Sequence, residues 1–127
     1  MLVLDASAMV DLLIGAAVGV AVAERIEGEL AHAPGHFDAE VLSALGRLHR
    51  AGLLSAPQVG SRLARLEEAP IERHPLVGLS RGAWGKRANL RLADALYVEL
   101  AAQLDAPLLT TDAALAAADR RAELVAI

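Results

Sequence analysis

Residues 1–13 of the chain read MLVLDASAMVDLL. The apolar run 2–4 is typical of a buried central strand, and the pattern of residues 7–14 predicts a helix that ends near Gly15. Asp5 lies at the junction between the two. A carboxylate at this position can cap the following helix, as Ser7 also can, or it can bind a metal ion, and the stretch alone leaves both roles open.

The rest of the chain predicts further strands and helices in alternation. Helices are expected over 17–27, 37–51, 56–69, 92–104 and 113–121, with a short one within 76–83, and strands over 30–34, 71–74, 106–112 and 124–127. The strand over 71–74 is expected at an edge. This alternation predicts an α/β fold with a parallel sheet covered by helices, and ligands bind such sheets beyond the carboxyl ends of their strands.

Composition narrows the class of protein. A chain of 127 residues predicts one domain, and the absence of Cys excludes disulfides, thiolate zinc sites and Cys nucleophiles. A net charge of −4 and only 2% aromatic residues argue against a basic or base-stacking nucleic-acid module. The apolar stretch 12–23 is too short to cross a bilayer and follows no basic segment, so we expect a cytoplasmic protein without a membrane anchor.

Four carboxylates occupy positions that share a pattern. Asp5 and Asp112 end apolar strands, while Glu40 and Asp94 lie in the first turns of helices among apolar neighbours. Each alone has a structural explanation as a cap or as a partner of the helix dipole. If the four converge, they repel one another, and a divalent cation such as Mg²⁺ or Mn²⁺ removes that repulsion.

Three segments carry a resemblance to a known family: LVLDASAMVDLL (2–13), FDAEVLSALGRL (37–48) and LADALYVELAAQLDAPLLTTDAAL (92–115). In these segments and in its length the chain resembles PIN-domain proteins, and more narrowly the VapC toxins of prokaryotic type II toxin–antitoxin systems. The resemblance implies a single PIN domain over 1–127, with a three-layer fold. Its central sheet is expected to be mostly parallel, with four or five strands and helices on both faces.

The same resemblance implies a Mg²⁺- or Mn²⁺-dependent endoribonuclease that hydrolyses RNA phosphodiester bonds. It assigns the catalytic and metal-binding roles to Asp5, Glu40, Asp94 and Asp112, and it implies that Ser7 and Thr110 orient the carboxylates. It also implies a cognate antitoxin and a homodimer. The sequence departs from many relatives in one respect, because residues 113–118 supply no further Asp or Asn for a second metal ion.

A basic segment over 73–91 leads directly to Asp94. It contains five cations and no acid, and we expect Arg81, Lys86, Arg87 and Arg91 to bind RNA phosphates. The alternative is a solvated loop with surface ion pairs. Four further residues are expected to lie outside the chemistry: Asp11 on the solvent side of its helix, Trp84 packing the loop, and His36 and His74 in structural roles.

Other functions place acids at strand ends as well. A receiver-type phosphoacceptor needs an acidic pair near the first strand and a late Lys, and a haloacid-dehalogenase-type phosphatase needs an Asp where Ser7 stands. The sequence provides neither. Two alternatives remain open: a small α/β interaction module whose acids only cap helices, and a housekeeping PIN nuclease without an antitoxin.

Overall fold

The computed structural model describes residues 1–127 and is built on a five-stranded sheet with the strand order β3-β2-β1-β4-β5. All four strand pairs are parallel. The strands are β1 (Leu2–Leu4), β2 (Ala31–Pro34), β3 (Ile71–His74), β4 (Leu108–Thr110) and β5 (Ala122–Leu124). The parallel sheet and the edge position expected for residues 71–74 are both confirmed.

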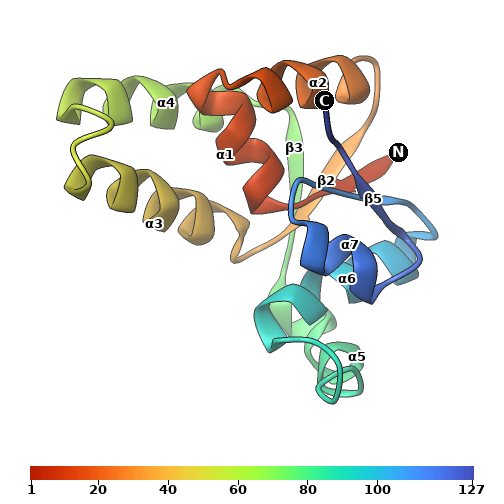
Figure 1. Cartoon of the computed structure of the whole chain (residues 1–127). Coiled ribbons are helices and arrows are strands. Elements are labelled where there is room, and N and C mark those ends of the chain that lie inside the picture. Colours follow the sequence, from red (N-terminus) through yellow and green to blue (C-terminus); the bar gives the residue numbers. More distant parts are fainter.

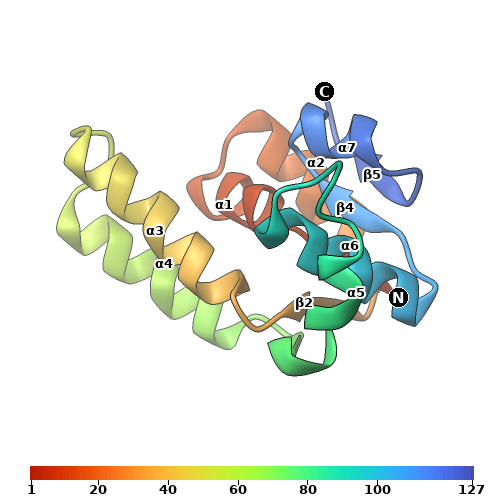
Figure 2. The same ribbon diagram turned by 90° about the horizontal axis from the view of Figure 1, so that it is seen from below.

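Helices occupy most of the remaining chain. They are α1 (Ala6–Ile14), α2 (Ala17–Ile26), α3 (Phe37–Arg50), α4 (Ala56–Glu68), α5 (Ser80–Trp84), α6 (Leu92–Leu104) and α7 (Ala113–Ala118), with the 3₁₀ turn η1 (Leu76–Gly78) before α5. The sheet lies between α1 and α2 on one side and α6 on the other, which gives the three expected layers (Figure 1). Helices α3 and α4 run side by side and project away from the sheet (Figure 2).

The register of the two central strands, β1 and β4, brings their carboxyl ends to the same edge of the sheet. β1 pairs with β4 so that Leu4 lies opposite Leu109, and the Asp5 amide continues the ladder by donating to the Leu109 carbonyl at 2.9 Å. Asp5 and Thr110 therefore leave neighbouring strands at the same end. Residues 2–4 are completely buried, as expected for a central strand in a parallel sheet.

Local signals explain most element ends. α1 stops at Gly15, which has φ 75°, a conformation that glycine adopts without strain. α4 begins with a capping box, in which the Ser55 hydroxyl accepts from the Gln58 amide and the Gln58 side chain accepts from the Ser55 amide. α3 places Phe37, Val41 and Leu45 in the core at helical spacing.

Two expected boundaries near the carboxyl end were wrong. α7 ends at Ala118 rather than continuing to 121, because Asp119 is extended and its carboxylate accepts from the Arg121 amide at 2.8 Å. This turn starts β5 at Ala122, so the strand precedes most of the apolar run 124–127 on which the expectation rested. Pairing with β4, rather than apolarity, decides which residues form this edge strand.

No helix has by itself both the length and the apolar character that are needed to span a membrane. α1 and α2 have them only when taken together, and these two helices meet at a bend of 115°.

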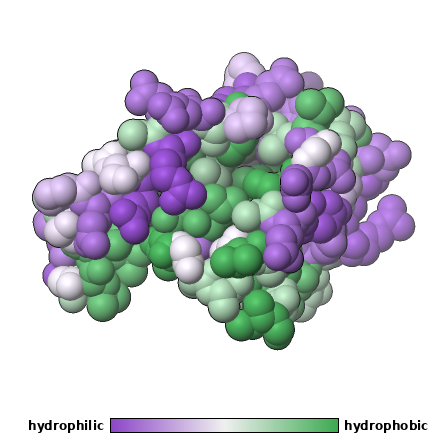
Figure 3. All heavy atoms as spheres, turned by 90° about the horizontal axis from the view of Figure 1, so that it is seen from above, coloured by the Kyte–Doolittle hydropathy of each residue, from purple (hydrophilic) through white to green (hydrophobic).

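Seen from above, apolar surface gathers along the middle of the molecule, between the α3–α4 hairpin and the opposite end, with hydrophilic residues on either side (Figure 3).

Candidate active site

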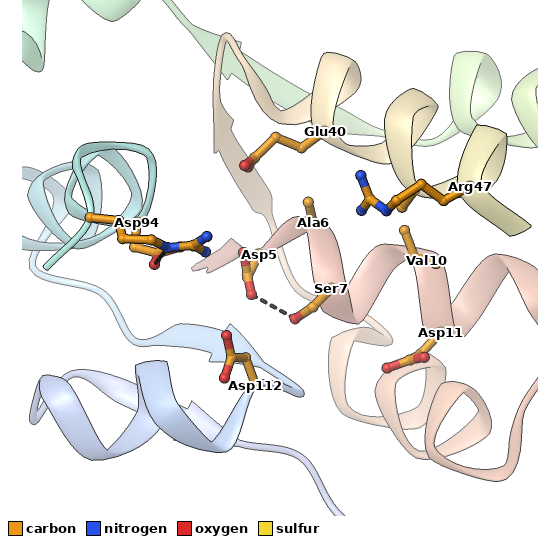
Figure 4. Close-up of a pocket in the computed structure, with 11 residues that line it drawn as sticks. Asp5, Ala6, Ser7, Val10, Asp11, Glu40, Arg47, Asp94 and Asp112 are labelled. Carbon is orange, nitrogen blue, oxygen red and sulfur yellow. Dashed lines mark hydrogen bonds and ion pairs between the residues drawn. The ribbon is translucent and has the colours of Figure 1, made fainter.

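The four predicted carboxylates line one cavity at the carboxyl ends of β1 and β4. Its volume is about 330 Å³, and the β1–α1 junction, α1, α3, α6 and the β4–α7 junction contribute to its wall (Figure 4). The structure thus brings together all four acids, which are separated by up to 107 positions in the sequence. The lining residues are Asp5, Ala6, Ser7, Val10, Asp11, Glu40, Ala44, Arg47, Arg91, Asp94 and Asp112.

Asp5 is the most buried of these acids, with 6% of its surface exposed. Its Oδ2 atom accepts hydrogen bonds from Ser7 Oγ at 2.6 Å and Thr110 Oγ1 at 2.7 Å. Burial raises the pKa of Asp5; the hydroxyl donors lower it, and the charges of Asp94 and Glu40 raise it further. No cationic side chain pairs with this carboxylate, so its charge is stabilised by neutral donors alone.

The two hydroxyls beside Asp5 form a connected network. Ser7 Oγ lies 3.2 Å from Thr110 Oγ1 and accepts from the Thr111 amide, while Thr110 Oγ1 accepts from the Asp112 amide at 3.0 Å. The idea that Ser7 caps the helix was wrong: Asp5 occupies the N-cap position, and Ser7 already lies inside α1. Because Ser7 makes no cap, its hydroxyl is free to hold the Asp5 carboxylate.

Glu40 projects from the first turn of α3. Its Oε1 atom accepts from the hydroxyl of Tyr97 at 2.7 Å and lies 3.5 Å from His36 Nε2. Tyr97 is completely buried, and burial together with the hydrogen bond to Glu40 raises the pKa of its hydroxyl well above the ordinary value. The phenol therefore stays a neutral donor that fixes one oxygen of Glu40.

Asp94 and Asp112 each contact residues next to them in the sequence and also line the cavity. Asp94 lies in the first turn of α6 and pairs with Arg91, whose Nε is 3.1 Å from Oδ2. The hydrogen bond to Asp94 raises the pKa of Arg91. Asp112 caps α7, because its Oδ1 accepts from the amides of Ala114 and Leu115, yet it still lines the cavity.

Only one of the four expected RNA-binding cations reaches the cavity. Arg91 lines it, whereas Lys86 donates to Glu99 at 2.7 Å, and Arg87 lies over the Trp84 ring at 4.6 Å and donates to the Trp84 carbonyl. Arg81 is exposed on α5 and does not line the cavity.

The structure adds Arg47 and Asp11 to the cavity wall. Arg47 follows Glu40 by seven residues, which is two helical turns on one face of α3, and this spacing was a signal available in the sequence. The expectation that Asp11 lies on the solvent side was wrong. Asp11 faces the β4 end, where its Oδ2 accepts from the Thr111 hydroxyl at 2.6 Å.

The donor set fits a hard divalent cation. The acids offer only carboxylate oxygens, the kind of ligand that Mg²⁺ and Mn²⁺ prefer, and Asp5 has no cationic partner. Two smaller cavities share residues with the acidic one: one adjoins it at Glu40 and Arg47, the other at Arg91, Asp94 and Asp112. The acids therefore lie midway along a longer depression.

Comparisons with known proteins agree with this geometry. Residues 2–121 match the model of the PIN domain family. The chain is 54% identical to Ribonuclease VapC3 of Mycobacterium tuberculosis over 117 residues, which span 91% of this chain and 85% of that protein. It is 40% identical to Ribonuclease VapC12 of the same organism over 116 residues, covering 91% and 90% of the two chains.

Two solved structures share the fold. The crystal structure of PAE2754 from Pyrobaculum aerophilum matches with a TM-score of 0.70 at 23% identity, covering 97% of this chain and 82% of that one. Mycobacterium tuberculosis VapC20, described as a toxin that cleaves the sarcin–ricin loop, matches with a TM-score of 0.69 at 14% identity, covering 93% and 95%. At these identities the likeness supports the fold alone.

Proposed function

Because this chain belongs to the PIN-domain family and is similar to VapC ribonucleases along most of its length, we propose that it is a metal-dependent endoribonuclease and the toxin of a type II toxin–antitoxin pair. The single observation that best supports the proposal is the convergence of Asp5, Glu40, Asp94 and Asp112 on one cavity. Four helix caps in an interaction module would have no reason to meet there.

These four carboxylates would hold Mg²⁺ or Mn²⁺. When bound, the ion supplies an activated water and neutralises charge on the scissile phosphate. Asp5 is the best-placed ligand, because two hydroxyls fix one of its oxygens in a buried setting. Glu40 is fixed in the same way by Tyr97. Residues 113–118 add no oxygen ligand, so a second ion would lack the ligand that many relatives supply there.

The roles of the surrounding side chains follow from their contacts. Ser7 and Thr110 orient Asp5 by donating to the same oxygen, and their own mutual contact at 3.2 Å limits how far either can rotate. Neutral donors of this kind hold a carboxylate without competing for its charge, which remains available to the ion.

The RNA backbone would follow the depression formed by the three connected cavities. Arg47 at one side and Arg91 at the other place guanidinium groups on either side of the acids, and guanidinium groups bind phosphate in a bidentate manner. Arg81 remains a candidate for a more distant phosphate contact. Lys86 and Arg87 would first have to leave Glu99 and Trp84.

We infer an antitoxin partner, a homodimer and a cytoplasmic location from the family, with residues 1–127 acting as one PIN domain. The projecting α3–α4 hairpin supports a partner surface, since Leu42 and Leu53 are 53% and 70% exposed there. Isolated apolar residues are common on surfaces, but two on one projecting hairpin suit a protein contact.

The proposal is tested with purified protein, a mixed RNA substrate, and Mg²⁺ or Mn²⁺. We expect cleavage that stops in EDTA and returns with excess Mg²⁺. Asp94→Asn should reduce both Mn²⁺ binding, measured by calorimetry, and RNA cleavage. Loss of a side chain that only supports a metal ligand costs roughly 10–100-fold, so the loss of a ligand itself should cost more. Cleavage that persists in EDTA, or equal Mn²⁺ binding by Asp94→Asn, would contradict the proposal.

A matched control lies at the end of the same helix. Asp105 follows α6, has an 89% exposed side chain, and does not line the cavity. Its backbone has φ 49°, a conformation that Asn also tolerates. Asp105→Asn should therefore leave metal binding and cleavage unchanged, which separates the loss of a ligand from the loss of one negative charge.

A further inference from the structure

A second cluster of metal-ligating side chains lies at the β2–β3 edge of the sheet. It consists of His32, Glu72 and His74, whose ligand atoms all lie within 4.8 Å of one another. His32 Nδ1 is 2.9 Å from His74 Nε2 and 3.5 Å from Glu72 Oε2. None of the three lines the acidic cavity.

The sheet itself brings these side chains together. His32 and Glu72 are paired across the parallel β2 and β3 strands, and His74 follows Glu72 by two residues. Side chains two residues apart on a strand share a face, and paired residues on neighbouring strands do as well. Rigid backbone pairing, rather than a flexible loop, therefore sets the separation of the three ligands.

We propose that His32, Glu72 and His74 form a Zn²⁺ site separate from the acidic cavity. Zinc lies about 2.0–2.2 Å from His nitrogen and carboxylate oxygen, so neighbouring ligand atoms of a tetrahedral site are roughly 3.3–3.5 Å apart. The separation of 3.5 Å lies at the upper limit of that range, and the separation of 2.9 Å between the two imidazoles is a few tenths of an ångström shorter than it. Small side-chain rotations are sufficient to admit the ion.

Burial and access also suit a bound ion. His32 has a 10% exposed side chain, while the Glu72 side chain is 70% exposed. One ligand is thus held firmly in the sheet, and the carboxylate can close over an ion arriving from solvent. Three protein ligands leave a fourth position for water, the arrangement of an open zinc site.

The two sites differ in the ions they prefer. Two imidazole nitrogens and one carboxylate select zinc and similar transition metals, whereas the all-oxygen cavity selects Mg²⁺ or Mn²⁺. A zinc ion here would tie the edge strand β3 to β2. It would stabilise the folded chain, because an ion that binds only the folded state raises the unfolding temperature. It would take no direct part in RNA cleavage, because none of its ligands lines the acidic cavity.

The test uses the full chain carrying Asp94→Asn, in excess Mg²⁺, so that the acidic cavity does not contribute. We expect calorimetry to detect a single equivalent of Zn²⁺, Co²⁺ to give the visible absorption of a four-coordinate site, and Zn²⁺ to raise the unfolding temperature. His74→Gln should abolish all three effects. Glu72→Gln, at an exposed side chain that folding does not require, should weaken Zn²⁺ binding at least roughly tenfold.

His49→Gln is the matched control, because His49 is an exposed histidine on α3, away from β2 and β3. It should leave Zn²⁺ binding unchanged. Two outcomes would overturn the proposal: no Zn²⁺ binding by the Asp94→Asn chain, or Zn²⁺ affinity that Glu72→Gln and His74→Gln leave equal to that of the Asp94→Asn chain. Either would show that the 2.9 Å contact is only a hydrogen bond between two imidazoles.

Discussion

Thr110→Val tests how strongly the hydroxyl network supports Asp5. Thr110 is completely buried; its hydroxyl donates to Asp5 Oδ2 at 2.7 Å and accepts from the Asp112 amide at 3.0 Å. Valine keeps the branched shape but removes both contacts. A hydrogen bond to a charged group contributes about 1.5–3 kcal/mol, and an unpaired buried amide costs about 1–3 kcal/mol.

The expected loss in the free energy of unfolding is therefore about 3–5 kcal/mol for metal-free protein at pH 7. For a chain of 127 residues this corresponds to a fall in Tm of about 12–20 °C, at about 4 °C per kcal/mol. Urea unfolding and calorimetry measure the two quantities. Mn²⁺ affinity should also fall roughly 10–100-fold, as it does when an outer partner of a metal ligand is removed.

Thr110→Ser supplies the control, because serine keeps the hydroxyl and loses only one methyl group. Its expected cost is about 1 kcal/mol, with little change in Mn²⁺ affinity. If the valine variant proves as stable as the serine variant, or binds Mn²⁺ equally well, the hydroxyl does not support Asp5 and the reasoning is refuted.

Three further predictions follow from the site and its supports. Burial raises the pKa of Asp5 above 3.8, so the metal-free protein should lose stability as the pH rises from that value through the folded-state pKa. Urea unfolding at a series of pH values should show that Asp5→Asn removes this loss, and calorimetry should detect no Mn²⁺ binding by the same variant. Arg47→Ala should weaken RNA binding in titrations and reduce the salt slope by about 1, with stability changed by no more than about 0.5 kcal/mol. Gly19→Ala should destabilise the fold by at least about 1–3 kcal/mol in urea, because its Cβ would collide with the Asp11 carbonyl where α2 crosses α1.

The convergence of the four acids could be predicted from the sequence because its signals are local. Asp5 and Asp112 follow apolar runs, and burial places such runs centrally, where β1 and β4 do pair. Glu40 and Asp94 lie in first turns whose helical spacing was clear. Local patterns thus fixed where each acid leaves its element, and the parallel sheet brought the elements to one end.

The cations were harder to predict because their partners are distant in the sequence. Lys86, in the turn after α5, pairs with Glu99, thirteen residues away on α6, and no local pattern reports that contact. The position of Asp11 depends on how α1 leaves β1 and on Thr111, a hundred residues later. Tertiary contacts of this kind redirect charged side chains without changing the secondary structure that carries them.

The pairing of Arg91 with Asp94 suggests how the proposed RNA phosphate would be accepted at an acidic cavity. The Arg91 side chain is 80% exposed, so its ion pair, at 3.1 Å, contributes only about 0.2–1 kcal/mol. An ion bound by Asp94 would compete for the same oxygens and release the guanidinium at small cost. Arg91 would then be free at the rim for an RNA phosphate, and metal occupancy would be coupled to RNA binding.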